Sequence, residues 1–262
     1  MLDSLSPQRR RVVLLAAGLA LLLVVGVAVT AALRLRTEAV EPVPQDQPGP
    51  VLLVPGYGGT GASLAPLAEA LRAAGREAVV VPPVGDGTGD LRAQASHLDE
   101  VARQVQADRG SASVDVVGYS AGGVVARLWV RDEGGGSVAR RVLTLGSPQH
   151  GTSQAALGLE LAGRCPRACE QLVPDSDLLR RLNARDETPA GPVWVTVRSA
   201  ADRVVTPVES AALDGALNLL IQDACPTAST AHPELPSDPY VLAALAAVLG
   251  PGAPAAPRQV SC

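Results

Sequence analysis

The stretch Gly118-Tyr119-Ser120-Ala121-Gly122 constrains the fold of this chain more than any other segment. An apolar run, 114–117, precedes it, and a segment with helical spacing follows it, so the context predicts a strand, a sharp turn and a helix. The G-x-S-x-G pattern needs its glycines because the turn strains the serine backbone and brings the strand and the helix close together. The pattern is short enough to arise by chance, so its meaning depends on the rest of the chain.

Short apolar runs alternate with helical segments along the chain after residue 50. The predicted strands cover 51–54, 77–81, 113–118, 142–146, 193–198 and 217–222. The predicted helices cover 64–73, 91–107, 124–131 and 240–249. Strands this rich in Val and Leu on both faces are typical of a buried parallel sheet. The alternation predicts one α/β domain, with a mostly parallel sheet of about six strands and helices on both faces.

The predicted domain covers 50–250, between a linker at 34–49 and a Pro/Ala-rich C-terminal tail at 251–262. The interval 151–192 interrupts the alternation, and an insertion of this kind beside a site usually shapes a pocket. Its apolar stretch, 155–162, either borders a pocket or packs as an ordinary helix, and the sequence leaves both open.

The N-terminal segment predicts a membrane anchor or a signal. A basic stretch, 1–11, precedes the uncharged apolar run 12–33, which is long enough to cross about 30 Å of hydrocarbon. We favour an uncleaved single-pass anchor with its N-terminus in the cytoplasm, because the run exceeds the apolar region of an ordinary signal peptide. The alternative is a cleaved signal, for which Thr30-Ala31-Ala32 offers a site. The domain is expected outside the cytoplasm in both cases, either anchored to the cell membrane or secreted.

An extracytoplasmic domain can form disulfides, and the chain has four cysteines. Four cysteines allow three pairings. We favour Cys165 with Cys169 and Cys225 with Cys262, because the second bond would tie the C-terminal tail to the domain. The cysteines and histidines lack the paired spacing of a zinc site. The net charge of −4, without any basic stripe, argues against nucleic acid as a partner.

A serine hydroxyl needs a neighbouring imidazole to take its proton. The chain has three histidines, of which His97 lies in a helix-like segment and is expected to pack or to face solvent. His150 comes just after a strand, where it lines the cleft or forms local hydrogen bonds. His232 lies in the loop between the last strand and the last helix, which opens at the same sheet edge as Ser120. His232 is therefore the predicted base.

The base in turn needs a carboxylate that holds the imidazole in the right tautomer. Asp202 follows the predicted strand 193–198 after a short polar turn, which places it at the same sheet edge. The order Ser120, Asp202, His232 is the chain order of α/β-hydrolases. Asp202 is the predicted acid, although an aspartate in this position can also serve as a turn residue or cap. The weaker alternatives are Asp175, Asp177 and Asp214.

Two backbone amides are needed to stabilise the oxyanion that forms when a serine attacks a carbonyl. Ala121 is predicted to supply one, because it follows Ser120 at the start of a helix. The second is expected from the glycine-rich loop 54–60, directly after the first strand of the domain, where Tyr57 is the favoured donor. A phosphate-binding loop is not indicated, because no G-K-[ST] sequence follows.

Five segments in this order resemble the bacterial lipase and esterase branch of the α/β-hydrolase superfamily, similar to small secreted triacylglycerol lipases. They are VLLVPGYGG (51–59), VDVVGYSAGG (114–123), TLGSPQHGT (144–152), DRVVTP (202–207), and His232 before Leu235. The resemblance covers 51–249. It implies Ser120 as nucleophile, Asp202 as acid and His232 as base, with the Tyr57 and Ala121 amides as the oxyanion hole. Pro55 departs from the family, where His commonly precedes the glycine; because the donor is a backbone group this should not abolish catalysis, but it weakens the transfer of the family's substrate preference.

The predicted activity is hydrolysis of a carboxylic ester through an acyl-enzyme. The expected partner is an ester or lipid substrate of the acylglycerol type, with the membrane contacted through the N-terminal anchor, and no organic cofactor is implied. Transfer of the acyl group to an alcohol is one alternative, because the same three residues serve it. A noncatalytic scaffold that binds a partner or lipid at the cell surface is another. We expect a monomer.

Overall fold

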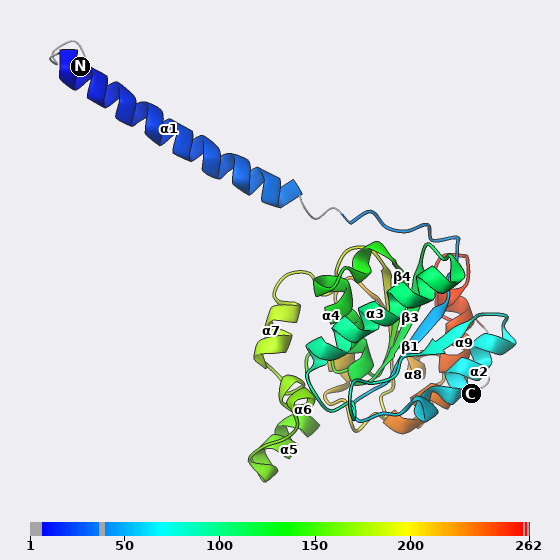
Figure 1. The fold of residues 1–262 in the computed structure, drawn as a ribbon. Coiled ribbons are helices and arrows are strands. Elements are labelled where there is room, and N and C mark those ends of the chain that lie inside the picture. The colour runs from blue at the N-terminus through cyan, green and yellow to red at the C-terminus, as the bar shows by residue number, and fades with distance from the viewer. Residues whose placement is uncertain (1–6, 37–39, 259, 261) are drawn as a thin grey trace. The chain divides into compact units, whose positions relative to one another are not determined.

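The computed structural model describes residues 7–36, 40–258, 260 and 262. The chain forms two compact units, Met1–Val40 and Glu41–Cys262. The first unit contains a single described helix, α1 (Pro7–Arg36). The second unit contains the sheet and all other described helices (Figure 1).

The anchor predicted over 12–33 is not supported by the structure. None of the helices in the described part of the chain is long and apolar enough to span a membrane. Residues 1–6 of the predicted cytoplasmic segment and residues 37–39 of the predicted linker lie outside the described residues.

The second unit is built from six strands, with helices between them. The strands are β1 (Val51–Val54), β2 (Ala78–Val80), β3 (Val114–Tyr119), β4 (Ala139–Leu145), β5 (Val193–Arg198) and β6 (Leu217–Leu220). The α-helices are α2 (Ala65–Ala73), α3 (Leu91–Arg109), α4 (Ala121–Asp132), α5 (Ser153–Ala162), α6 (Arg167–Gln171), α7 (Asp177–Asn183), α8 (Ile221–Ala224) and α9 (Pro239–Leu249). Short 3-10 helices are η1 (Gly61–Leu64), η2 (Gly135–Ser137), η3 (Val208–Ala211) and η4 (His232–Ser237).

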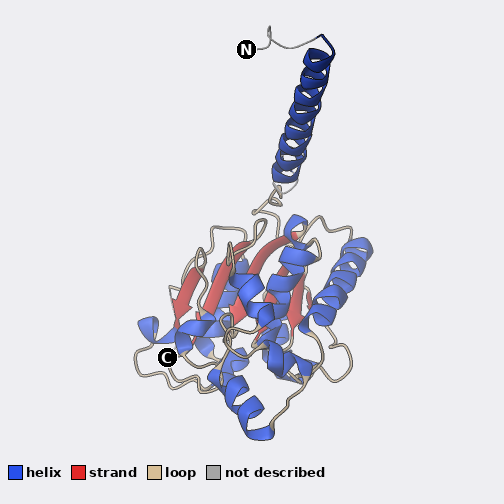
Figure 2. Cartoon of the chain, turned by 90° about the vertical axis from the view of Figure 1, so that its left-hand side faces the viewer, coloured by secondary structure: helices blue, strands red, loops and turns tan. Residues whose placement is uncertain are grey.

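The strands form one parallel sheet in the order β2-β1-β3-β4-β5-β6. Parallel neighbours need crossover connections, and the helices of these crossovers lie on both sides of the sheet (Figure 2). The predicted α/β-hydrolase fold is confirmed. Because every strand runs in the same direction, the loops that follow β1, β3, β4 and β5 all open at one edge of the sheet.

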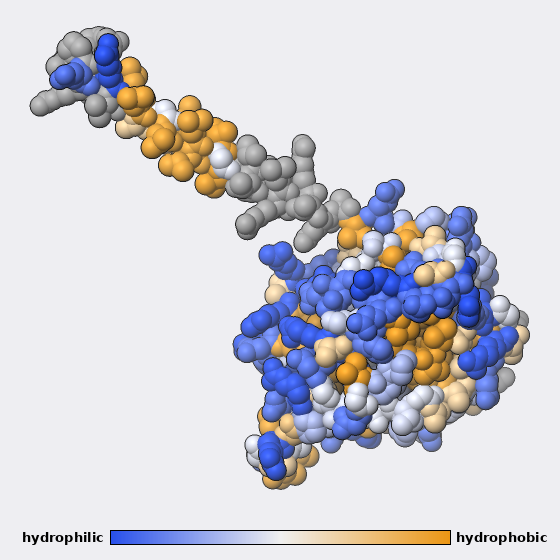
Figure 3. All heavy atoms as spheres, in the orientation of Figure 1, coloured by the Kyte–Doolittle hydropathy of each residue, from blue (hydrophilic) through white to orange (hydrophobic). Residues whose placement is uncertain are grey.

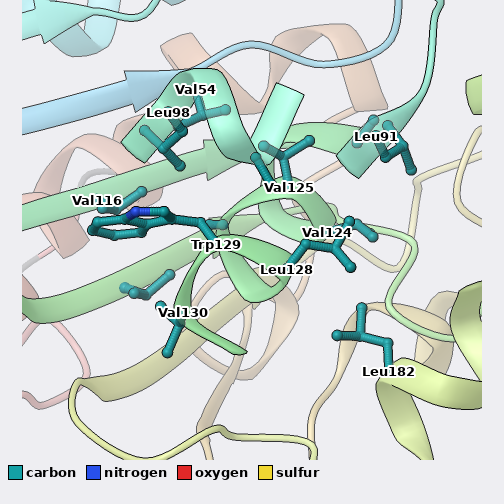
Figure 4. Packing of buried hydrophobic residues seen from close by; sticks show 14 of the residues in the cluster. Val54, Leu91, Leu98, Val116, Val124, Val125, Leu128, Trp129, Val130 and Leu182 are labelled. Carbon is teal, nitrogen blue, oxygen red and sulfur yellow. The ribbon is translucent and has the colours of Figure 1, made fainter. Parts of the chain in front are cut away.

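Each face of the sheet has its own apolar core, since successive strand residues point to opposite faces. Leu52 and Val54 of β1 pack with α3 and α4, whereas Val51 and Leu53 pack with α2 and α9. Figure 4 shows the first core around Trp129, with side chains from β1, β3, α3, α4 and α7. Both faces of β1 are thereby buried, which explains its uninterrupted apolar sequence.

Strand β4 begins at Ala139, three residues before the predicted start at Val142. The sequence argues against this start because it places Arg140 and Arg141 in a central strand. Both arginines are nevertheless buried, and Arg140 lies with Asp115 of β3, its Nη2 at 2.6 Å and its Nε at 2.9 Å from the carboxylate oxygens. Carbonyl groups of the C-terminal segment accept hydrogen bonds from both guanidinium groups. Paired in this way, the charges can be buried.

The end of β6 and the start of α4 also differ from prediction, for local reasons. Strand β6 ends at Leu220 and not at Gln222, because the buried Ile221 starts the short helix α8. Helix α4 starts at Ala121 and not at Val124, so that it follows Ser120 directly. The second difference brings the free amides of the helix N-terminus next to the serine.

The insertion 151–192 contains three helices, α5, α6 and α7. None of the residues of α5 is buried, and Leu157 and Leu161 are 46% and 78% exposed, so α5 is not an ordinary packed helix. In Figure 3, apolar atoms reach the surface where α5 projects at the lower left. By contrast, α6 and α7 contribute Ala168, Leu178 and Leu182 to the core.

The chain contains two disulfides, Cys165–Cys169 and Cys225–Cys262. This is the favoured pairing of the three that the sequence allows. The first bond bridges the N-terminal turn of α6. The second joins the end of α8 to the last residue of the chain and so holds the tail against the domain.

Candidate active site

Ser120 lies in the strained turn that the G-x-S-x-G pattern predicts. Its backbone has φ 53° and ψ −127°, between the end of β3 and the start of α4. The neighbouring glycines are required by close backbone contacts, because a Cβ on Gly122 would lie 2.2 Å from the Val54 carbonyl oxygen. A Cβ on Gly118 would lie 2.6 Å from the Cα of Gly123. The turn therefore depends on residues without side chains, and it holds Ser120 at the carboxyl edge of the sheet.

Ser120, His232 and Asp202 form a continuous hydrogen-bonded row. The Nε2 atom of His232 lies 3.0 Å from Ser120 Oγ, and its Nδ1 atom lies 2.7 Å from Asp202 Oδ2. An ionised carboxylate can only accept, so Nδ1 carries the proton and Nε2 accepts from the serine hydroxyl. This is the tautomer in which an imidazole can take a proton from serine.

The carboxylate of Asp202 is buried and held by the backbone of its own loop. Its Oδ1 atom accepts hydrogen bonds from the Val204 and Val205 amides at 2.8 and 2.9 Å, which leaves Oδ2 for His232. Asp202 is 2% exposed and His232 is 6% exposed. Because water has little access to this pair, their orientation is set by the protein and not by solvent.

Tyr119 contacts His232 both through its ring and through its hydroxyl group. The two rings stack, with centroids 5.2 Å apart and an angle of 29° between planes. The Tyr119 hydroxyl donates to the His232 carbonyl oxygen at 3.1 Å. Burial and the nearby Asp202 charge raise the pKa of Tyr119 to about 12. Tyr119 therefore stays neutral at physiological pH and acts in packing, a role that its sequence position alone does not reveal.

The two backbone amides predicted for the oxyanion hole, those of Tyr57 and Ala121, have no acceptor among the described residues. The Ala121 amide opens α4, where the first turn leaves N–H groups unpaired. The Tyr57 amide lies in the turn Gly56–Gly59. This turn is close to the serine, because a Cβ on Gly56 would lie only 2.8 Å from Ser120 Cβ. The Tyr57 side chain is 42% exposed.

The other histidines and aspartates lie away from this row. His97 is hydrogen bonded to Glu100 on the surface of α3, and His150 contacts Glu187 and the Ser210 carbonyl oxygen. His150 thus forms local hydrogen bonds, which is one of its two predicted roles. The alternative carboxylates are exposed, and they are Asp175, Asp177 and Asp214.

Gly146 is a site residue that sequence reasoning missed. It directly follows the last residue of β4 and has φ +50°, and a Cβ there would lie 3.1 Å from Asp202 Oδ2 and 3.2 Å from His232 Nδ1. Its place at the end of the predicted strand 142–146, in the run Leu145-Gly146-Ser147, is the signal that the sequence offers. Among the described residues, no group of three or more His, Cys, Asp or Glu side chains could hold a metal ion.

A model of the lipase (class 2) family matches residues 97–233, more than half of the chain. The chain belongs to the class 2 lipase family. The match includes Ser120, Asp202 and His232, and the family is one of carboxylic ester hydrolases. No curated protein sequence matches this chain.

Solved structures of lipases share the fold of this chain. Lipase B of Aspergillus fumigatus has a TM-score of 0.71 and 19% identity, over 85% of this chain and 57% of that one. The mature form of lipase BlEst2 from Bacillus licheniformis has a TM-score of 0.56 and 18% identity, over 68% and 84% of the two chains. The chain thus spans little more than half of the Aspergillus lipase.

Proposed function

We propose that this chain hydrolyses carboxylic esters of the acylglycerol type with Ser120 as nucleophile, His232 as base and Asp202 as acid. The observation that carries the proposal is the hydrogen-bonded row from Asp202 Oδ2 through His232 to Ser120 Oγ, at 2.7 and 3.0 Å. Membership of a lipase family supports the reaction class, and the geometry supports the assignment of roles. The acylglycerol preference follows from the family alone.

In the first half of the reaction, Ser120 Oγ forms a bond to the ester carbonyl carbon as its proton moves to His232 Nε2. The imidazolium that results is stabilised by the buried Asp202 carboxylate. The oxyanion is positioned to accept hydrogen bonds from the Tyr57 and Ala121 amides, which have no other acceptor in the described structure. When the tetrahedral intermediate collapses, His232 returns the proton to the departing alcohol oxygen and Ser120 keeps the acyl group.

In the second half, a water molecule replaces the alcohol. His232 takes a proton from the water as its oxygen attacks the acyl carbon, and the same two amides stabilise the second oxyanion. The proton then passes to Ser120 Oγ, and the carboxylic acid leaves. Each residue therefore acts twice, which is why one hydrogen-bonded row is sufficient for both steps.

We also propose that the enzyme works outside the cytoplasm. The two disulfides support this location, because bonds of this kind persist in oxidising compartments. The proposed catalytic domain covers 50–250, with the linker 34–49 before it and the tail 251–262 after it.

The proposal is tested by assaying the purified full chain with p-nitrophenyl esters of increasing acyl length. We expect turnover that falls by at least about a thousandfold in a Ser120→Ala variant, because the nucleophile is lost. A Ser137→Ala variant is the matched control, since Ser137 is exposed and lies in η2, outside the candidate site. Equal turnover in the Ser120→Ala variant and the wild type would contradict the assignment. Product analysis with added alcohol separates hydrolysis from acyl transfer.

A further inference from the structure

The turn Gly56–Gly59 is held by hydrogen bonds from two of its backbone amides. The Gly59 amide donates to the Gly56 carbonyl oxygen at 3.0 Å and closes the turn. The Gly58 amide donates to the Gly87 carbonyl oxygen at 3.2 Å, outside the turn. Neither the Gly56 amide nor the Tyr57 amide has an acceptor among the described residues, and the proposed function assigns the Tyr57 amide to the oxyanion. The Gly58 amide is next to Tyr57 in the chain and is held by the Gly87 carbonyl oxygen. The direction of the Tyr57 N–H bond therefore depends on the position of Gly87.

Gly87 belongs to the loop 81–90 between β2 and α3, which is held from two sides. On one side, Gln94 of α3 accepts from the Val84 amide at 2.9 Å and donates to the Val84 carbonyl oxygen at 3.0 Å. On the other side, the Ala168 amide of α6 donates to the Thr88 carbonyl oxygen at 3.0 Å. Gln94 is close to Val84 in sequence, whereas Ala168 belongs to the insertion 151–192.

Gln171, at the end of α6, makes two further hydrogen bonds from the insertion, to the end of this loop and to the start of α3. Its Oε1 atom accepts from the Leu91 amide at 2.8 Å, and its Nε2 atom donates to Asp90 Oδ1 at 2.7 Å. Asp90 caps α3 by accepting from the Arg92 amide at 2.9 Å. Gln171 is 3% exposed, so water cannot replace these bonds without a rearrangement. One side chain thus holds the end of the loop and the start of α3 together.

Helix α6 cannot keep this position by its own stability, because a helix of one turn is not stable in isolation. It is held by the Cys165–Cys169 disulfide across its N-terminal turn and by the Ser176 hydroxyl, which donates to the Gln171 carbonyl oxygen at 2.7 Å. Ala168 is fully buried in the core. The insertion therefore offers a fixed support for the loop.

We infer that Gln171 is a positioning residue for the oxyanion hole: it holds the loop 86–90, whose Gly87 carbonyl fixes the Gly58 amide and so directs the Tyr57 amide toward Ser120. This inference rests on the proposed function for the role of the Tyr57 amide. The hydrogen bonds of Gln171 to Asp90 and Leu91, and of Gly58 to Gly87, do not depend on that role. The insertion thereby acts on catalysis through the backbone, without any contact between Gln171 and the substrate.

The kinetic test uses a Gln171→Met variant of the full chain, which keeps the side-chain length and removes both hydrogen bonds. We expect kcat to fall roughly ten- to a hundredfold with KM changed less than about twofold, because a misdirected donor weakens binding of the transition state more than of the ester. The affinity for a trifluoromethyl ketone, whose serine adduct carries an oxyanion, should fall in parallel. Gln45→Met is the matched control, since Gln45 Nε2 also forms two hydrogen bonds, to the Val43 and Arg140 carbonyl oxygens, but at the start of β4 and not at the sheet edge where Ser120 lies.

A Gln171→Glu variant separates positioning from loss of packing. Its carboxylate can accept from the Leu91 amide but repels Asp90, whereas its protonated form can donate to Asp90 as glutamine does. The ratio of its kcat to that of the wild type at the same pH should therefore rise as the pH is lowered. A flat ratio would mean that the bond to Asp90 does not position the site.

Hydrogen–deuterium exchange provides a readout that does not need turnover. We expect faster amide exchange in the segments 56–60 and 84–91 of the Gln171→Met variant, and wild-type exchange there in Gln45→Met. Unchanged exchange in both segments overturns the inference, even if the enzyme has no activity on the esters chosen. Normal kcat and ketone affinity in a folded Gln171→Met variant also overturn it, while the proposed function stands as long as Ser120→Ala is inactive.

Discussion

Gly146 is the residue on which the geometry of the His232–Asp202 pair most closely depends. It has φ +50°, and the space that a Cβ would occupy is already filled by Leu235 Cδ1 at 2.5 Å and by the reacting pair. We expect a Gly146→Ala variant to lose about 1–2 kcal/mol of stability from the left-handed backbone and to lose activity as well. Because His232 must move, kcat/KM should fall roughly tenfold or more. Thermal unfolding and ester hydrolysis measure the two effects.

A matched substitution separates backbone strain from displacement of the site. Gly75 has φ +74°, and a Cβ there would meet no atom within 4 Å. A Gly75→Ala variant should lose a similar amount of stability but keep its wild-type kcat/KM. Equal activity in the two variants would show that the Gly146 position does not control the His232–Asp202 geometry.

At the scale of elements, the two disulfides are expected to act differently because they close loops of different length. Cys225 and Cys262 are 37 residues apart in sequence, whereas Cys165 and Cys169 are 4 apart. On the chain-entropy model, removal of the long-range bond costs about 4 kcal/mol and removal of the short-range bond about 2 kcal/mol. Urea unfolding of the two double Cys→Ser variants measures these costs.

The variant without the Cys165–Cys169 bond should lose more kcat than the variant without the Cys225–Cys262 bond, because loss of the former bond loosens α6. The reverse order of the kcat losses would contradict this expectation.

Strand β4 includes two buried arginines that its local sequence pattern does not predict. A run of two arginines is unfavourable in a central strand unless each charge finds a partner. Asp115 accepts from Arg140, and Arg76 also reaches this carboxylate at 2.6 Å. Arg141 instead reaches the Gly250 carbonyl oxygen at 2.8 Å. These partners lie far from β4 along the chain, so no local pattern could have predicted its start.

At the scale of the molecule, the unit Glu41–Cys262 contains every residue of the candidate site and both apolar cores. A variant that lacks residues 1–40 should therefore fold with the same melting temperature as the full chain. Its kcat and KM for a short, water-soluble ester should agree with those of the full chain within about twofold, since no site residue is removed. Loss of folding or of activity would show that residues 1–40 contribute to the unit.

The chain order of the site was predictable from the sequence, because each of its residues follows a recognisable strand. Parallel strands bring the loops at their carboxyl ends together, so Ser120, Asp202 and His232 could be placed at one edge before their distances were known. The sequence could favour one disulfide pairing but could not prove it, since four cysteines allow three sets. The membrane anchor was an interpretation of one apolar run, and the structure does not support it.

The tertiary structure alone decided the contacts between segments that are distant in sequence. Gly146 is a site residue only because Asp202 and His232 pack against it, and Tyr119 supports His232 only because the two rings meet across the turn. In the same way, Gln171 becomes important through its bonds to Asp90 and Leu91. Local patterns carry strand and helix periodicity and the spacing of turns. They do not carry the packing of one segment on another, which depends on how the whole chain fills space.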